Sequence, residues 1–153
     1  MSAPVEQTMF FVKPMVHRDN REVQASLETD IRQNIIEMGF RRRIRESHTL
    51  TEDDLRTIYP DLPPEIWDAT VRHMLGAEVV LVLLEGEGVI GKLADRVGRE
   101  VSPRNCHEGT LRRRYGSHTP DELGQTGFVY WHNAIHCPKN AEEAARDVAW
   151  FFP

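Results

Sequence analysis

The 153-residue chain contains only two cysteines, Cys106 and Cys137, and no apolar run long enough to cross a membrane. Two cysteines are too few for the disulfide framework that stabilises small secreted domains. A membrane-spanning helix needs about 18 or more consecutive apolar residues, and residues 1–9 lack the basic start and apolar stretch of a secretory signal. We therefore expect a cytoplasmic protein with no membrane partner.

The chain also lacks an excess of positive charge and any internal repeat. Its formal net charge is -5 at pH 7, whereas nucleic-acid-binding domains are usually basic overall, so we expect no nucleic-acid partner. Hydrophobic residues make up 40% and charged residues 28% of the chain, which is typical of a folded globular protein. A chain of this length predicts one domain, residues 1–153, with a core of its own.

The spacing of apolar residues predicts alternating strands and helices. Short runs of β-forming residues predict strands at 7–12, 40–48, 78–85 and 128–132. Helical spacing and capping residues predict helices at 23–38, 51–59, 65–75, 89–97 and 141–152. The segment 99–127 is rich in Gly, Pro, Ser and charge, which predicts mostly loop. This order favours the α+β class: a ferredoxin-like sandwich, with a four-stranded antiparallel sheet and helices packed on one of its faces.

A set of residue groups occurs in a fixed order along these predicted elements. The groups are Phe10-Phe11-Val12-Lys13-Pro14, Tyr59, the segment from Val80 to Gly86, Glu108-Gly109-Thr110-Leu111-Arg112, Asn133-Ala134-Ile135-His136, and Trp150-Phe151-Phe152. Each group alone is weak evidence. The ordered set, with matching elements between its members, resembles the nucleoside diphosphate kinase family over nearly the whole chain.

The resemblance implies an enzyme that moves the terminal phosphate of ATP, or of another nucleoside triphosphate, onto a histidine and then onto a nucleoside diphosphate. His136 takes the position of that histidine, and Asp147 takes the position of the acidic residue that holds its ring. The implied nucleotide-binding residues are Lys13, Tyr59, Arg112, Asn133 and Ile66, with Trp67 as the alternative to Ile66 for stacking on the base. The resemblance also implies Mg²⁺ held mainly by the nucleotide phosphates, no metal site in the protein itself, and assembly into a homo-oligomer.

The chemistry of these residue types agrees with the implied reaction. A neutral imidazole is a competent nucleophile near pH 7, because the unperturbed pKa of histidine is about 6.5. Transfer through a covalent intermediate divides one displacement into two steps and produces ping-pong kinetics. The moving phosphoryl group needs charge stabilisation from lysine, arginine and a metal ion. The sequence therefore supplies a nucleophile and cations for phosphoryl transfer.

The sequence also departs from the family pattern. Cys137-Pro138-Lys139 stands where Gly-Ser-Asp is usual, and the expected arginine of the helix at 89–97 falls on Ala94, with Lys92 and Arg96 wrongly spaced to replace it. The segment between Arg112 and Asn133 is longer than is usual. These departures leave open an alternative function, a nucleotide-binding or regulatory module with weak or no turnover, and a third, an interaction protein that keeps only the fold.

Each candidate residue also has a structural interpretation. His136 could be a buried, hydrogen-bonded histidine, Asp147 a surface helix residue and Asn133 a turn residue. A structural zinc site is a further alternative, because the chain holds the metal-binding residue types His107, His132, His136, Cys106 and Cys137. Their spacing lacks a Cys-x-x-Cys unit, which argues against that alternative.

Overall fold

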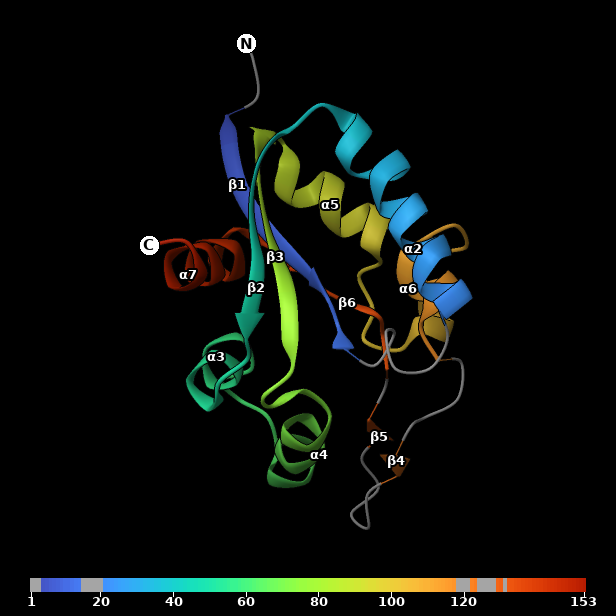
Figure 1. Cartoon of the computed structure of the whole chain (residues 1–153), viewed down its shortest axis with the longest axis vertical. Coiled ribbons are helices and arrows are strands. Elements are labelled where there is room, and N and C mark those ends of the chain that lie inside the picture. Colours follow the sequence, from blue (N-terminus) through green and yellow to red (C-terminus); the bar gives the residue numbers. More distant parts are fainter. Residues whose placement is uncertain (1–3, 15–20, 118–121, 124–128, 131) are drawn as a thin grey trace.

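The computed structural model describes residues 4–14, 21–117, 122–123, 129–130 and 132–153 (Figure 1). Its main sheet has four strands in the order β2 (Arg41–Thr49), β3 (Glu78–Glu87), β1 (Val5–Val12) and β6 (Ile135–His136). All neighbouring pairs are antiparallel. The predicted α+β fold with a four-stranded antiparallel sheet is therefore confirmed.

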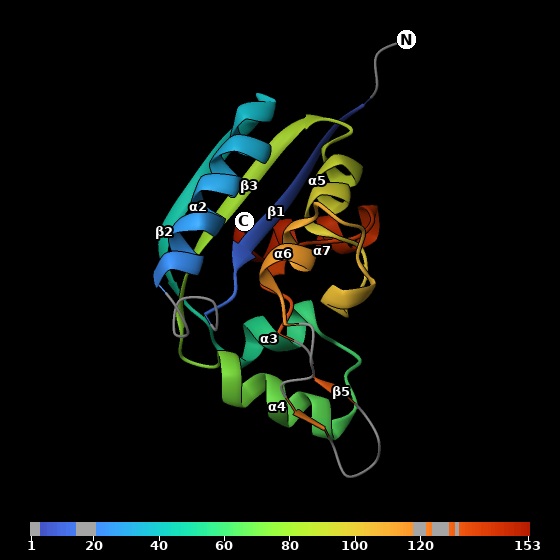
Figure 2. The same ribbon diagram turned by 90° about the vertical axis from the view of Figure 1, so that its right-hand side faces the viewer.

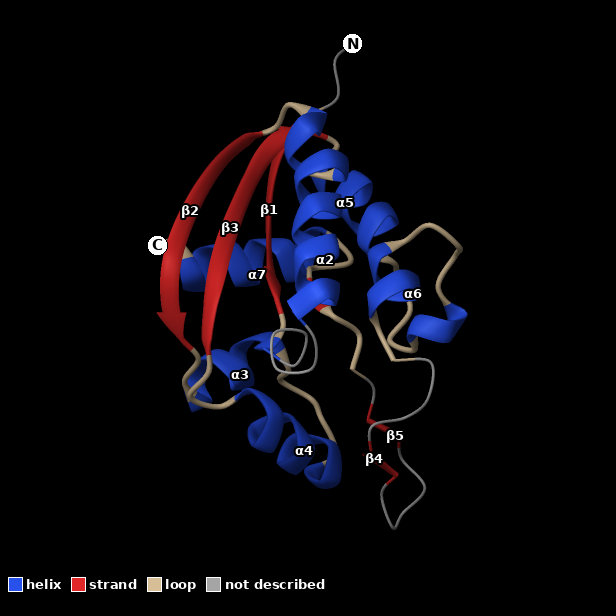
Figure 3. Cartoon of the chain, turned by 45° about the vertical axis from the view of Figure 1, so that its right-hand side comes forward, coloured by secondary structure: helices blue, strands red, loops and turns tan. Residues whose placement is uncertain are grey.

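Helices cover both faces of this sheet, not one face as the sequence predicted (Figures 1 and 3). One face packs against α2 (Arg21–Asn34), α5 (Val89–Val97) and α6 (Leu111–Tyr115), and the other against α3 (Glu52–Ile58), α4 (Pro64–Met74) and α7 (Ala141–Phe151).

The alternation of side chains along β1 shows why both faces are covered. Phe10 belongs to the core cluster on the side of α2 and α5, whereas its neighbours Met9 and Phe11 belong to the cluster on the side of α7. The same alternation separates Val82 from Leu81 and Leu83 in β3. Nearly continuous apolar runs such as these occur where both faces of a strand are buried. The one-face prediction was wrong because it did not use this feature.

The fourth strand of the sheet also differs from the prediction. Part of the strand predicted at 128–132 lies outside the described residues. Its described part, β5 (Val129–Tyr130), pairs with β4 (Glu122–Leu123) in a separate two-stranded ribbon beside α4 (Figure 2). The fourth place is taken by β6, which pairs with the end of β1 so that His136 lies opposite Phe11. A strand of two residues is too short to produce a periodic pattern in the sequence.

Two predicted helix starts are confirmed in detail. Thr51 begins α3 with a capping box, in which the Asp54 backbone N–H donates to Thr51 Oγ1 (3.1 Å) and the Thr51 N–H donates to Asp54 Oδ2 (2.9 Å). Asn140 begins α7, where its Oδ1 accepts from the Glu143 N–H (2.9 Å). The Glu143 carboxylate accepts from the N–H of Lys139 (2.8 Å), one residue before the cap.

The described stretch that follows α5 runs from Gly98 to Ser117. It contains a short 3-10 helix, η2 (Pro103–Asn105), and α6, which begins at Thr110. Gly98, which ends α5, has φ +113, and an added Cβ would lie 2.8 Å from the Cys106 Sγ atom. Only glycine fits this close turn.

Among the described residues, no helix has the length and hydropathy needed to pass through a membrane.

Candidate active site

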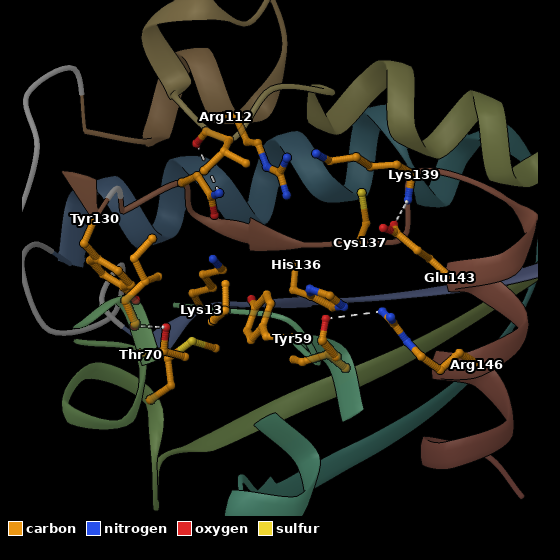
Figure 4. Close-up of a pocket in the computed structure, with 16 residues that line it drawn as sticks. Lys13, Tyr59, Thr70, Arg112, Tyr130, His136, Cys137, Lys139, Glu143 and Arg146 are labelled. Atoms are coloured by element: carbon orange, nitrogen blue, oxygen red, sulfur yellow. Dashed lines mark hydrogen bonds between the residues drawn. The ribbon is translucent and has the colours of Figure 1, made fainter. Parts of the chain in front are cut away.

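One cavity brings together the residues that the sequence places far apart. It has a volume of about 320 Å³ and is lined by parts of α3, α4, α6, β5, β6 and α7 (Figure 4). All of the predicted nucleotide-binding residues and the predicted nucleophile line it: Lys13, Tyr59, Ile66, Arg112, Asn133 and His136. Asp147 lies directly behind His136.

His136 is held from three sides. Its Nε2 atom lies 2.8 Å from Asp147 Oδ2, and Asp147 is completely buried in α7. The Phe11 ring stacks on the imidazole with a centroid distance of 5.1 Å, and the Tyr59 ring meets it edge-on at 5.6 Å. Because an ionised carboxylate can only accept, Nε2 carries the ring proton and Nδ1 carries the lone pair. Nδ1 has no hydrogen-bond partner among the described residues.

The surroundings of His136 favour its neutral form. Burial lowers the pKa of His136 below its ordinary value, and the positive charges of Lys13 and Arg112 act in the same direction. The Asp147 carboxylate opposes this shift without reversing it. A neutral imidazole with a free Nδ1 lone pair is the form that can attack an electrophile.

A strained backbone position precedes the histidine. Ala134 has φ 72, in the left-handed region that residues with a side chain seldom adopt, and its carbonyl accepts from the backbone N–H of Lys13 (2.8 Å). This bond joins the end of β1 to the start of β6. It holds Lys13 and His136 on the same side of the cavity.

Lys13 and Tyr59 lie together in the cavity. Lys13 is 6% exposed, and its Nζ atom is 5.7 Å from the centre of the Tyr59 ring. The Tyr59 hydroxyl is buried without a hydrogen-bond partner among the described residues. Burial raises the pKa of Tyr59 far above its ordinary value, so this hydroxyl stays protonated and can donate to a ligand.

Arg112 donates most of its guanidinium N–H groups to backbone carbonyls, which the sequence did not predict. Its Nε and Nη2 atoms donate to the Ile135 carbonyl (3.3 and 2.9 Å), and Nη1 donates to the carbonyls of Gly98 (3.1 Å) and Glu100 (3.2 Å). A guanidinium group has five N–H bonds, so one remains for a ligand. Arg112 therefore connects α5, the following segment and β6, while its charge still faces the cavity.

Asn133 and Ile66 also line the cavity. Asn133 Nδ2 donates to the Val101 carbonyl (3.2 Å), and its buried Oδ1 has no partner among the described residues. Ile66 lines the cavity, but the adjacent Trp67 does not. The Trp67 ring instead lies under the Arg56 guanidinium, 4.4 Å from its centre. Of these two apolar residues, Ile66 is the one that lines the cavity.

Sequence reasoning missed several lining residues, of which Arg146 is the most closely connected. Its Nε donates to Asp147 Oδ1 (2.9 Å) and its Nη2 to the Ile58 carbonyl (3.2 Å), so it fixes the carboxylate that holds His136 and ties α7 to α3. Its position directly before Asp147 was the available signal. The other missed residues include Thr70, Tyr130, Cys137, Lys139 and Glu143.

Cys137 follows His136 but has the properties of a packing residue. It is 4% exposed, and burial raises the pKa of its thiol to about 11. The thiol is therefore protonated near neutral pH, whereas the thiolate is the reactive form. Both cysteines are buried and unpaired.

Comparison with known proteins agrees with this arrangement. The family model described as nucleoside diphosphate kinase matches residues 6–153. The nucleoside diphosphate kinase of Persephonella marina is 28% identical over 151 residues, covering 97% of this chain and 94% of its own length.

Two solved structures share the fold. That of the Aquifex aeolicus nucleoside diphosphate kinase has a TM-score of 0.71 at 21% identity and covers 98% of this chain and 96% of its own. A transition-state mimic of the Borrelia burgdorferi enzyme, with bound vanadate and ADP, has a TM-score of 0.73 at 20% identity, over 97% and 88%. The family match spans both the sheet and the cavity. The chain belongs to the nucleoside diphosphate kinase family.

Proposed function

We propose that this chain is a nucleoside diphosphate kinase with His136 as the residue that carries the phosphoryl group. The family supplies the reaction, the transfer of a terminal phosphate between nucleotides. The observation that carries the residue assignment is the orientation of the His136 ring. Its Nε2 is held by buried Asp147, so Nδ1 is the nitrogen left to attack.

The first half of the reaction forms a bond from His136 Nδ1 to the γ-phosphorus of a nucleoside triphosphate. The bond between that phosphorus and the bridging oxygen breaks, and the nucleoside diphosphate leaves with the electron pair. Because Nδ1 carries no proton, no base is needed, and Asp147 stabilises the positive charge that develops on the ring. The second half repeats these steps in reverse with another nucleoside diphosphate.

The remaining cavity residues are assigned to nucleotide binding. Lys13, Tyr59 and Asn133 carry polar groups that face the cavity and can donate to phosphate or sugar oxygens. Arg112 adds positive charge through its remaining N–H, and Ile66 contacts the flat face of the base. We assign Asp147 to orientation of His136, through the 2.8 Å contact.

The proposed cofactor is Mg²⁺ carried on the nucleotide phosphates. Among the described residues, no group of three or more His, Cys, Asp or Glu side chains could hold a metal ion. The cationic lining of the cavity fits the phosphates themselves, and Mg²⁺ prefers phosphate and water oxygens to an all-protein cage. The ion would neutralise charge on the triphosphate during transfer.

Labelling with γ-³²P-ATP tests the assignment. The wild-type protein should become labelled at His136, and the label should be stable to base and labile to acid. The variant His136→Ala should lose the label, whereas Cys137→Ser, which changes the next residue, should keep it. Labelling of the alanine variant at the wild-type level would reject His136 as the nucleophile.

The alternative of a binding module with weak turnover is favoured by one observation. Four of the five Arg112 N–H groups donate to backbone carbonyls, so this arginine has little capacity left for phosphate. A coupled nucleoside diphosphate kinase assay, beside ATP binding measured by thermal shift, separates the two functions. Binding without turnover would support the module.

We also propose that the chain forms a homo-oligomer in the cytoplasm. The edge strand β2 exposes its side chains along nearly its whole length, including Ile44 at 46% exposure, so it can pair with another copy. The unpaired buried cysteines suit a reducing compartment. Light scattering of the purified protein tests the assembly.

A further inference from the structure

Among the described residues, four cationic side chains line the cavity, and they differ in the hydrogen bonds that they already make. They are Lys13, Arg112, Lys139 and Arg146. The two arginines are already used by the protein: Arg112 donates to three backbone carbonyls, and Arg146 holds Asp147 and the Ile58 carbonyl. The Arg146 charge is thus paired with a carboxylate and most Arg112 donors are used, so a phosphate chain would need further donors from another cationic group.

The backbone of Lys139 is hydrogen-bonded on both sides, whereas its ammonium group is not. Its N–H donates to the Glu143 carboxylate (2.8 Å), and its carbonyl accepts from Arg99 Nη1 (3.4 Å). The ammonium group has no hydrogen bond or ion pair among the described residues. In Figure 4 the side chain extends from the turn before α7 toward Arg112. The backbone hydrogen bonds thus position Lys139, and its ammonium group is available to a ligand in the cavity.

The other candidates for this charge do not reach the cavity. Ala94, at the position where the sequence led us to expect an arginine, is completely buried. Lys92 places its Nζ 5.7 Å from the centre of the Phe40 ring, and neither Lys92 nor Arg96 lines the cavity. Lys139 reaches the cavity from the connection between β6 and α7, far from α5 in the sequence.

We propose that Lys139 binds the terminal phosphates of the nucleotide and supplies the positive charge that position 94 lacks. This inference rests on the proposed function of the site and assigns a role to a residue that sequence reasoning passed over. An ammonium group on a flexible stem is a compact charge with three donors, suited to phosphate oxygens whose position changes during transfer. Arg112, held rigidly by the backbone, would provide the fixed charge beside it.

The variant Lys139→Gln removes the charge and keeps most of the side-chain length. Two measurements are needed: the single-turnover rate of His136 phosphorylation by γ-³²P-ATP, and the affinities for ATP and for adenosine by calorimetry. A hydrogen bond to a charged group corresponds to about a tenfold to hundredfold change. We expect a loss of this size in the phosphorylation rate or in the ATP affinity, with adenosine affinity unchanged. Lys139→Arg should recover most of it.

Lys92→Gln is the matched control, because it removes the same charge from an exposed position outside the cavity. It should behave as wild type. Equal phosphorylation rates and equal ATP affinities in Lys139→Gln and Lys92→Gln would overturn the proposal. An equal loss of ATP and adenosine affinity in Lys139→Gln would overturn it too, because the effect would not depend on the phosphates.

The two proposals can fail separately. If the wild-type protein is never phosphorylated on His136 but binds ATP more tightly than Lys139→Gln does, the proposed transfer fails and the phosphate-binding role of Lys139 stands. If His136 is phosphorylated and Lys139→Gln matches wild type in both measurements, the transfer stands and the role of Lys139 fails.

Discussion

The two sides of the cavity are built differently. On the nucleophile side, β1, β6 and α7 surround His136 with buried partners, Asp147 and Phe11 among them. On the other side, the segment from α5 to α6 has a buried alanine at position 94 and an arginine, Arg112, whose N–H groups mostly donate to the backbone carbonyls of Gly98, Glu100 and Ile135. The side that holds His136 brings it together with its predicted partner Asp147, whereas the other side lacks an arginine at position 94.

This difference follows from what each side must do. A nucleophile needs one orientation, and a buried carboxylate at 2.8 Å provides it. Charge on a phosphate chain can be neutralised from several directions, because electrostatic attraction is less directional than nucleophilic attack. A positively charged side chain can therefore come from a different element, as proposed for Lys139. The positions of His136 and Asp147 allow less variation.

The substitution Asp147→Asn should have the largest effect, because it tests whether Asp147 sets the tautomer of His136. The asparagine can turn its Oδ1 to Arg146 Nε, as Asp147 does now, and its NH₂ group would then face His136. His136 Nε2 would become the acceptor, the proton would move to Nδ1, and the attacking lone pair would be lost. We expect the phosphorylation rate to fall by about 10²–10⁴-fold, as when a catalytic histidine is held in the wrong tautomer.

Asp147→Glu is the control for this variant, because it keeps an acceptor at a longer reach. Single-turnover labelling measures both variants, and thermal unfolding checks that each is folded. If Asp147→Asn retained the wild-type rate, Asp147 would not control the tautomer of His136.

Restoring the missing arginine tests the opposite side of the cavity. Ala94 is completely buried in α5, so Ala94→Arg must overpack the core and bury a charge. We expect the free energy of unfolding to fall by at least about 3 kcal/mol, without faster transfer. Urea denaturation measures the loss, and Lys92→Arg, on the exposed face of α5, should change stability by less than about 0.5 kcal/mol. A stable and faster Ala94→Arg enzyme would show that the cavity can accept charge from α5.

The same contrast explains what could be predicted from the sequence. Long apolar runs and capping residues revealed β1, β3, α3 and α7, because these signals are local. The partnership of His136 and Asp147 was predicted from the family resemblance, and the structure brings the two side chains together.

Other features depend on contacts between distant segments and leave little trace in the sequence. The two-residue strand β6 exists because it pairs with the end of β1. The hydrogen bonds of Arg112 require the carbonyls of Gly98, Glu100 and Ile135 to meet at one point. The position of Lys139 in the cavity depends on how α7 packs, so its sequence neighbours could not reveal it.

The acid dependence of His136 tests the nucleophile side alone. Burial depresses the pKa of His136, so the folded protein resists protonation of the ring below the ordinary value of about 6.5. The ring should remain neutral as the pH falls through that value and become protonated only in more acidic solution. The corresponding stability is present above the ordinary pKa and is lost as the pH falls below it.

Histidine ring resonances followed by NMR between pH 5 and 8 measure this shift directly. The spectrum of His136→Gln identifies the resonance. A midpoint for His136 at or above the ordinary histidine value of about 6.5 would contradict the depressed pKa and with it the account of the neutral nucleophile.

The smallest expected effect concerns the base. Ile66 lines the cavity, whereas Trp67, the next residue on α4, lies against Arg56 outside it. Ile66→Ala should weaken nucleoside diphosphate binding about fivefold, the scale of one or two lost CH₂ contacts, and should leave the phosphorylation rate at saturating ATP unchanged. Trp67→Ala removes more apolar surface from the same helix and should leave the affinity at its wild-type value. Calorimetry with ADP compares the two, and a larger loss in Trp67→Ala would place the base on the other face of α4.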